Sequence, residues 1–493
     1  MQSEEIEMRL AAEEFSESEF SQYHFFSHSD EQVIRRLMGA GPVLLRGPRG
    51  SGKSAYMLAA HNRIRDREPK VFSTYISLRH FPLLSAVAAQ YLEVLIPYVA
   101  DCIRKELANR HIADAGKFNR HLTIAELKED LNDFGTKRQQ RIVLLFDDVA
   151  HIGRETSLAG FFDFFRTVSS SVVSCKAAIY PGVTKFGARF DFYSDATIVE
   201  AQRDERSSDF GTFFEELLSK RHPKILAKSE NRLKGSLGIF LGRAVLGNIR
   251  AFNAFCAHLE TYPIVSVVSL SDSLKWLASS YLYPALEELQ TKLGAYAPML
   301  KIAEDLAPII FSECGRKKVN AMVVHKEHVQ RIGKVFEILE YTGFISKREA
   351  SRSLARSGSG RGPRYALSLG PLLESIPGNM LSYELISSLT RTTVGYEEIV
   401  EFPPTASISK FSCPEPTSEI ELDILSLPVE RLAKSAAIPY GLTDLMIKSL
   451  RAGGYGTVQD VVKVSVEELQ KLDGIWTAKA KKIRNAVEQA IWM

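Results

Sequence analysis

The chain has 493 residues, of which 45% are hydrophobic and 25% charged, and its formal net charge is +3. This length predicts three or four domains, and the composition is ordinary for a globular protein. The sequence contains no uncharged apolar run of 18 residues, and its acidic start lacks the basic and then apolar order of a signal peptide. We therefore expect a cytoplasmic protein with no membrane partner.

The spacing of the cysteines and the distribution of charge narrow the kinds of site and partner that the chain can have. No C-x-x-C pair occurs, which argues against a zinc ribbon and against a disulfide framework. The charge is uneven, because the N-terminus is acidic whereas 346–364 and 479–484 are basic. The five cysteines are Cys102, Cys175, Cys256, Cys314 and Cys413.

The first motif in the chain is "GPRGSGKS", which follows the apolar run "PVLL" and precedes "AYMLAA". Its spacing, G-x-x-x-x-G-K-S, is typical of a loop whose backbone N–H groups cradle a phosphate chain at a helix N-terminus. Lys53 is expected to reach the β and γ phosphates, and the Ser54 hydroxyl is expected to bind Mg²⁺. The alternative is a chance glycine loop between a strand and a helix. The predicted ATP-binding residues are Gly47, Pro48, Arg49, Gly50, Ser51, Gly52, Lys53, Ser54 and Ala55.

A second motif, "RIVLLFDDVAHIG", supplies the acids that such a loop requires. Ile142 to Phe146 predict a buried strand, and Asp147 follows at its carboxyl end, where ligands of open α/β sheets bind. We expect Asp147 to hold Mg²⁺ and Asp148 to polarise water. Without the glycine-rich loop, Asp148 would be read as a solvated turn residue.

The order of these parts resembles AAA-type ATPases, specifically bacterial relatives of the origin-recognition initiator ATPases, which border on the STAND NTPases. The resemblance covers roughly residues 20 to 300. It implies a polar sensor residue at the end of the strand in "KAAIYPGVTKF", where Tyr180 or Thr184 would stand. It also implies an arginine finger acting on a neighbouring subunit, for which Lys185 and Arg189 are candidates and Arg189 is preferred.

The same resemblance implies a helical lid with a nucleotide-sensing arginine. In "LGNIRAFNAF", Gly247 and Asn248 can cap a helix, and Arg250 falls in its first turn, where the helix dipole disfavours a cation unless an anion is near. A surface arginine paired with an acid is the alternative. Asp148 stands where vigorous ATPases of the family carry glutamate, which predicts slow, switch-like hydrolysis.

Beyond the lid, "HKEHVQRIGKVFEILEYTGFISKRE" has helical spacing that breaks at Gly343 into a strand. A basic loop and the strand "YALSL" follow, an order that resembles a winged helix. Its loop arginines are predicted to contact DNA phosphates, although a solvated hairpin tip or a protein-binding surface are alternatives. These residues are Arg352, Arg356, Arg361 and Arg364.

The C-terminal region follows a proline- and serine-rich stretch, "EFPPTASISKFSCPEPTSEIE", which predicts a flexible tether. The last 60 or so residues resemble the C-terminal domain of the RNA polymerase alpha subunit, which is built on helix-hairpin-helix units. Thr457 and Ser465 are predicted helix caps, the latter with Glu468 as a capping box. The turn Gly474 to Trp476 carries a bulky tryptophan where a second glycine is usual, so DNA and protein binding remain open. The basic residues beside the turn are Lys479, Lys481, Lys482 and Arg484.

These observations predict an α/β P-loop NTPase core with a parallel sheet and a helical lid, a winged-helix domain, and a small all-α helix-hairpin-helix domain. The function they favour is an ATP- and Mg²⁺-binding switch that couples nucleotide state to DNA binding, as an oligomer or within a larger complex. A STAND-like sensor of a protein partner, with an effector, and a scaffold that binds nucleotide for stability alone are the alternatives. The resemblance implies roles such as mobile-element maintenance or anti-phage defence. The predicted boundaries are 1–30 for an acidic segment, 31–205 for the core, 206–297 for the lid, 298–372 for the winged helix, 373–420 for a connecting segment and linker, and 421–493 for the last domain.

Overall fold

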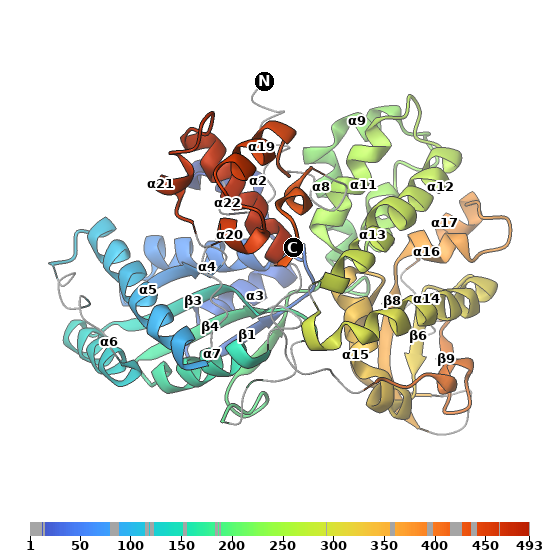
Figure 1. Cartoon of the computed structure of the whole chain (residues 1–493). Helices are drawn as coiled ribbons and strands as arrows, with labels where there is room; N and C mark the ends of the chain where they lie inside the picture. The colour runs from blue at the N-terminus through green and yellow to red at the C-terminus, as the bar shows by residue number, and fades with distance from the viewer. Residues whose placement is uncertain are drawn as a thin grey trace.

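The chain forms a sheet core, a helical lid above a winged helix, and a small C-terminal helical domain (Figure 1). The computed structural model describes residues 12, 15–78, 88–113, 118, 123–150, 155–182, 186, 189–291, 293–354, 360–391, 398–414, 426–434, 441–462 and 464–492.

The core sheet has five parallel strands in the order β2-β3-β4-β1-β5. Strand β4 lies between β1, which leads into the glycine-rich loop, and β3, which carries the two aspartates. The carboxyl ends of all three therefore open at one edge of the sheet. The strands are β1 (Val43–Arg46), β2 (Val71–Ser77), β3 (Arg141–Ala150), β4 (Val173–Ile179) and β5 (Thr197–Glu200).

Helices cover both faces of this sheet, and successive strand residues enter two different hydrophobic clusters. Leu44 and Leu144 pack on one face, whereas Leu45 and Leu145 pack on the other. This period of two, with both faces covered, is why β3 reads as a continuous apolar run. The face of Leu45 is covered by α3 (His28–Met38) and α4 (Lys53–Arg67), and the face of Leu44 by α5 (Ala88–Asn109), α6 (Ile124–Arg138) and α7 (Glu155–Val168).

The boundary predicted at residue 31 is wrong, because the core begins earlier. Helix α2 (Glu17–Tyr23) places Phe20, 6% exposed, in the same cluster as Val43 and Tyr56. Helix α3 begins at His28. Only part of the acidic segment can therefore lie outside the ATPase core.

The lid consists of short helices that pack mainly through aromatic and leucine side chains, as in the tilted contact of Phe214 with Phe252. Its elements are α8 (Phe210–Arg221), α9 (Pro223–Lys228), α10 (Leu237–Ala244), α11 (Ile249–Glu260), α12 (Val267–Trp276), the π-helical turn η3 (Leu277–Leu282), α13 (Tyr283–Glu287) and the 3₁₀ turns η4 (Glu288–Thr291) and η5 (Gly294–Tyr296).

The winged helix contains the predicted order of helix, strand, loop and returning strand. Helix α15 ends at Thr342, and Gly343 follows with a φ of 89° that glycine adopts readily. The lid and the winged helix share one hydrophobic cluster, which includes Phe214 and Leu339, so the two are packed against each other. The elements are α14 (Pro298–Lys317), β6 (Ala321–Val324), α15 (Lys326–Thr342), β7 (Ile345–Ser353), β8 (Arg361–Leu367), α16 (Leu369–Glu374) and α17 (Tyr383–Thr390).

Part of the predicted flexible tether is folded, which corrects that prediction. Strand β9 (Val400–Phe402) pairs in parallel with β6 and completes a sheet of order β7-β8-β6-β9. The 3₁₀ turn η6 (Ser407–Lys410) follows and buries Ile408 completely. Proline and serine obscured these segments in the sequence, because the strand is only three residues long and its partner is distant. Residues 415–425 lie outside the described part of the chain.

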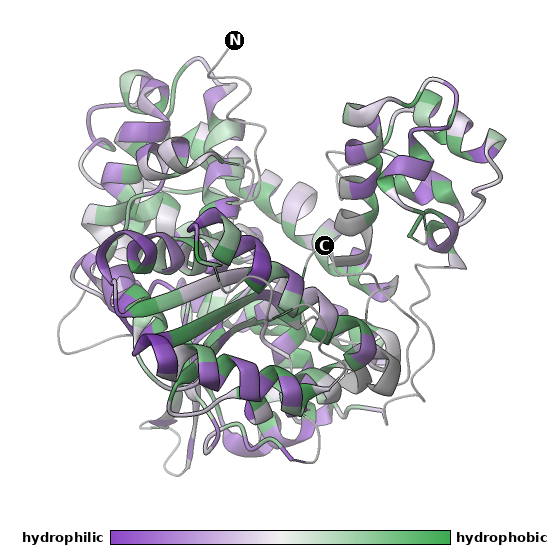
Figure 2. Cartoon of the chain, turned by 90° about the vertical axis from the view of Figure 1, so that its left-hand side faces the viewer, coloured by the Kyte–Doolittle hydropathy of each residue, from purple (hydrophilic) through white to green (hydrophobic). Residues whose placement is uncertain are grey.

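The C-terminal domain has a hydrophobic core of its own, built around residues such as Leu450 and Ile483. Figure 2 shows it as a separate body. Both predicted caps are confirmed: the Thr457 hydroxyl accepts from the Asp460 N–H, and Ser465 forms a capping box with Glu468. The elements are η7 (Val429–Leu432), α19 (Asp444–Ala452), α20 (Val458–Val462), α21 (Val466–Leu469) and α22 (Thr477–Trp492).

The five cysteines, all of which the structure describes, form no disulfide. Among the described residues, no helix combines the length and apolarity needed to cross a bilayer.

Candidate nucleotide site

The glycine-rich loop lies between β1 and α4 in a conformation that larger residues would resist. Gly50 and Gly52 have φ values of 79° and 94°, in the left-handed region. A Cβ on Gly47 would come within 2.7 Å of the Ser51 hydroxyl oxygen and 3.0 Å of the Ala201 Cβ. Gly52 is the N-cap of α4, so the free N–H groups of the first helical turn face the loop. The loop therefore presents free N–H groups at a helix start, an arrangement that suits a phosphate.

Lys53 is buried at the centre of this loop, with 5% exposure. Its Nζ donates to the carbonyl oxygens of Gly47 at 2.7 Å and Pro48 at 3.0 Å. The ammonium also lies 3.7 Å from the centroid of the Tyr180 ring, a cation–π contact. Burial lowers the pKa of Lys53 to about 7, against the opposing effect of Asp148 and Asp147. An anion that enters the loop would therefore stabilise the charged form of Lys53.

Asp147 is fully buried where β3 ends its regular pairing with β4. Its Oδ2 accepts from the Tyr75 hydroxyl at 2.7 Å, and its Oδ1 accepts from the Asp148 N–H at 2.9 Å. Ser54 stands in the first turn of α4, which follows the adjacent loop. A hydroxyl and a carboxylate, both oxygen donors, suit Mg²⁺, which takes its remaining ligands from water and phosphates. The donor set thus fits the predicted metal, which would offset phosphate charge.

Asp148 adopts a positive φ of 52° after the last regular pair of the strand. Its Oδ1 accepts a hydrogen bond of 3.0 Å from the Tyr180 hydroxyl. Tyr180 immediately follows β4, so it stands at the predicted sensor position and contacts both Lys53 and Asp148. Thr184, the other sensor candidate, lies outside the described residues.

The lid closes on the loop through the start of α11. Asn248 caps this helix as predicted, with its Oδ1 accepting from the Ala251 N–H at 3.1 Å. Its Nδ2 donates to the Arg49 carbonyl oxygen at 2.5 Å, and the Arg250 N–H donates to the Gly50 carbonyl oxygen at 3.4 Å. A Cβ on Gly50 would come within 2.5 Å of the Asn248 Oδ1 and 2.7 Å of the Arg250 Cβ. Arg250 thus lies beside the phosphate loop, as its predicted role requires.

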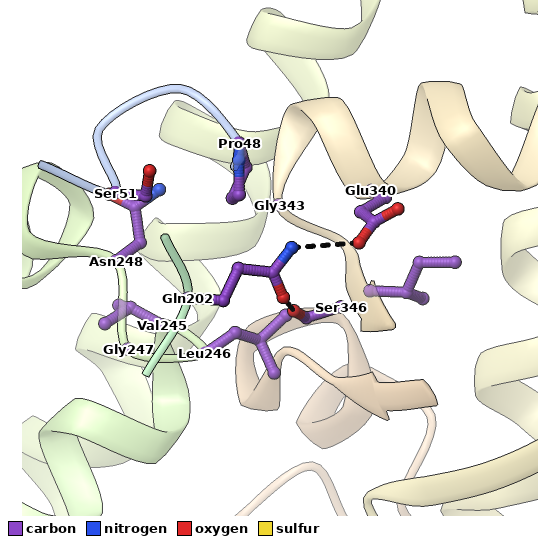
Figure 3. A pocket seen from close by; sticks show the side chains of 11 residues that line it. Pro48, Ser51, Gln202, Val245, Leu246, Gly247, Asn248, Glu340, Gly343 and Ser346 are labelled. Atoms are coloured by element: carbon purple, nitrogen blue, oxygen red, sulfur yellow. Dashed lines mark hydrogen bonds between the residues drawn. The ribbon is translucent and has the colours of Figure 1, made fainter. Parts of the chain in front are cut away.

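The winged helix also reaches this site, a contact that sequence reasoning missed. A pocket beside the loop is lined by Pro48 and Ser51, by lid residues Val245 to Asn248, and by winged-helix residues Glu340 and Ser346. In Figure 3, Gln202 bridges Glu340 and Ser346 across this pocket. No local pattern marked these residues, because their partners are more than 130 positions away.

The arginine-finger candidates are only partly described. Arg189 is exposed, and its backbone carbonyl oxygen accepts from Arg166 on α7. Its role as an arginine finger stays a prediction. Lys185 lies outside the described residues.

The four loop arginines of the winged helix differ in what they contact. Arg352 is 32% exposed and pairs with Glu349 at 3.2 Å, and Arg361 is exposed and donates to Ser351. Arg356 lies outside the described residues.

The prediction that Arg364 contacts DNA is wrong. Its side chain is 1% exposed, and its Nη2 lies 3.2 Å from the Glu205 carboxylate, which also pairs with Arg348 at 2.8 Å. Strand β8 directs this side chain toward the ATPase core, so the guanidinium forms an ion pair inside the protein.

The basic residues of the C-terminal domain also differ in their exposure and in what they contact. Lys481 and Lys482 are exposed. Lys479 donates to the Gly474 carbonyl oxygen at 2.8 Å, and its ammonium lies 3.7 Å from the centroid of the Trp476 ring. Arg484 does not join the predicted basic face, because its Nη1 donates to the Val462 and Val464 carbonyl oxygens inside the domain.

The sequence matches no protein-family model and no curated protein. Several solved structures have a similar arrangement. The ORC1 protein of Aeropyrum pernix in complex with DNA is 13% identical, over 74% of this chain and 92% of that chain, with a TM-score of 0.32. Cdc6p from Pyrobaculum aerophilum is 12% identical, over 76% and 98%, with a TM-score of 0.32. Drosophila ORC bound to DNA is 12% identical, over 78% and 94%, with a TM-score of 0.33. Likenesses this distant carry no functional argument, so function must be argued from the site.

Proposed function

We propose that this protein is an AAA-type, ATP-binding switch that hydrolyses ATP slowly and couples its nucleotide state to DNA binding or to assembly of a larger complex. The observation that carries the proposal is that the core, the lid and the winged helix all meet at the glycine-rich loop. The sheet supplies Lys53 and Asp147, the lid supplies Asn248 and Arg250, and the winged helix supplies Glu340. A ligand bound in the loop would contact residues of all three parts or displace the contacts that they make.

Slow hydrolysis is supported by the state of Asp148. Its side chain is one methylene shorter than glutamate, and one of its oxygens is engaged by Tyr180. A carboxylate held in this way is a weak candidate for orienting an attacking water. We therefore expect nucleotide binding to set the conformation, with hydrolysis as a slow reset.

The direct test is calorimetry of the full chain with a non-hydrolysable ATP analogue and excess Mg²⁺. Saturable heat, absent with Lys53→Ala, supports the proposal, and no heat at saturating ligand contradicts it. DNA coupling is tested by titrating a generic duplex at several salt concentrations with and without the analogue. Binding that weakens with salt and responds to nucleotide is the expected result.

A protein-sensing role in the STAND manner is the second candidate. It is favoured by Trp476, which is 60% exposed and lies over Lys479, so that an aromatic ring covers the hairpin lysine. Exposed aromatic residues of this kind are common in protein interfaces. Absence of salt-dependent DNA binding, together with intact nucleotide binding, would select this candidate.

A further inference from the structure

Helix α15 of the winged helix lies across the carboxyl ends of three neighbouring core strands, β4, β1 and β5. Its Lys334 Nζ donates to the Gly182 carbonyl oxygen, beyond β4, at 2.6 Å. Its Glu340 accepts from Arg46 Nη2, at the end of β1, at 3.0 Å, and from Gln202, beyond β5, also at 3.0 Å. Glu340 is 2% exposed in its side chain, so these are buried contacts. One helix of the winged helix is thus held at the carboxyl ends of β4, β1 and β5.

The next residue on α15, Tyr341, contacts the sensor position. Its ring centroid lies 5.5 Å from that of Tyr180, with the planes tilted by 54°. Both rings are buried, at 6% and 7% exposure, and burial raises the pKa of each phenol, so both are neutral. An aromatic pair at this separation is attractive beyond the area that it buries. Tyr341 therefore packs against Tyr180 beside the phosphate loop, where Arg49, Asp148 and Arg250 act on its phenol electrostatically.

Tyr180 in turn fixes the resting position of Lys53. The Lys53 ammonium lies over its ring, and the Tyr180 hydroxyl bonds Asp148. In this arrangement two carbonyl oxygens and a ring face hold the Lys53 ammonium. A triphosphate must draw Nζ away from these partners. Each contact that stabilises the resting position therefore subtracts from nucleotide affinity.

We propose that Tyr341, a residue of the winged helix, is a positioning residue for the nucleotide site: it holds Tyr180 over Lys53 and so keeps the phosphate-binding lysine in its resting position. Through this contact the winged helix sets the affinity of the core for nucleotide. By linkage, nucleotide binding changes the seating of the winged helix by the same free energy. The inference rests on the proposed nucleotide binding and adds the residue that couples it to the winged helix.

The test is the affinity of the full chain for a non-hydrolysable ATP analogue with Mg²⁺, measured by calorimetry for the wild type and three variants. Tyr341→Ala removes the ring, which lets Tyr180 shift into the vacated space and away from Lys53. We expect its affinity to rise about tenfold, within the range typical of coupling between sites. Tyr341→Phe keeps the ring and should bind as the wild type does.

The matched control is Phe336→Ala, on the same helix. Phe336 is 1% exposed and stacks on Tyr365 at 5.4 Å, with no ring contact to Tyr180 among the described residues. This variant should lower the melting temperature without raising nucleotide affinity. A gain of affinity is informative, because a merely destabilised protein would lose affinity.

The outcomes separate the two proposals. If the wild type binds the analogue and Tyr341→Ala binds it equally or more weakly, the inference about Tyr341 is overturned while the proposed function stands. If neither the wild type nor any variant binds nucleotide, the proposed function is wrong and the inference about Tyr341 is wrong with it.

Discussion

The phosphate loop and the wing of the winged helix are both basic, glycine-containing turns, yet they use their charges differently. In the loop, the lysine that the spacing selects lies at the centre of the site. In the wing, one of the selected arginines, Arg364, is buried against Glu205, and Arg361 remains on the surface. The spacing of residues within a loop specifies the local backbone geometry. Whether a side chain on a strand is buried or exposed depends instead on what packs against that strand. The predictions below test this contrast.

The largest effect is expected from Arg364→Ala. Removing this guanidinium leaves the buried Glu205 carboxylate paired with Arg348 and without the second of these two arginines. Breaking a buried pair in this way typically costs about 3 to 5 kcal/mol of unfolding free energy. Denaturant unfolding of the full chain would show it, provided that the transition of the core and winged helix is resolved from that of the C-terminal domain. Arg361→Ala, the surface control, should change the unfolding free energy by less than about 0.5 kcal/mol. Equal effects of the two substitutions would contradict the assignment of Arg364.

Lys53→Ala tests the loop. It removes the only ammonium that the spacing directs at the β and γ phosphates, and charge-assisted hydrogen bonds of this kind are each worth about 1.5 to 3 kcal/mol. We expect nucleotide affinity to fall at least about a hundredfold, measured by calorimetry with Mg²⁺ and a non-hydrolysable analogue. The exposed Lys70, replaced by alanine, is the control and should leave affinity unchanged. If Lys53→Ala loses stability but binds nucleotide normally, the loop is a structural element.

The pH dependence of binding should report the same lysine. Burial lowers the pKa of Lys53 to about 7, and a bound triphosphate would raise it. Above pH 7 the lysine must therefore take up a proton on binding, so affinity should fall by up to about tenfold per pH unit as the pH rises from 7 to 9. The buffer dependence of the calorimetric enthalpy measures the proton uptake directly. Proton release, or a pH-independent affinity, would contradict the lowered pKa.

The smallest effect is expected from the exposed wing arginines. If Arg352 and Arg361 contact phosphates, replacing either with alanine should weaken duplex binding a few-fold and lower the slope of affinity against salt by about one unit. Unfolding free energy should not change. A loss of DNA binding without a change in salt slope would place the contact elsewhere. Lys137, which is exposed on α6, is the surface control, and its replacement by alanine should leave duplex binding unchanged.

Much of the fold and the core of the site were predictable because their signals are local. Residues within a few positions of one another specify the strand before the loop, the strand that carries Asp147 and the helix that is capped by Gly343. The same holds for the caps at Asn248 and Ser465. Backbone conformation and capping depend on such neighbours, so the sequence carries them directly.

The tertiary structure decided what distant segments do to one another. Arg46 and Glu340 are 294 positions apart, and no local pattern links them. The burial of Arg364, the addition of β9 to the winged-helix sheet and the contact of Tyr341 with Tyr180 likewise depend on which surfaces meet when the lid and winged helix close on the core. By itself the sequence determined a glycine-rich loop at the start of a helix and a buried strand that carries Asp147. Only the packing of the whole chain brought the winged helix to that loop, because long-range contacts are selected by complementary surfaces and not by spacing.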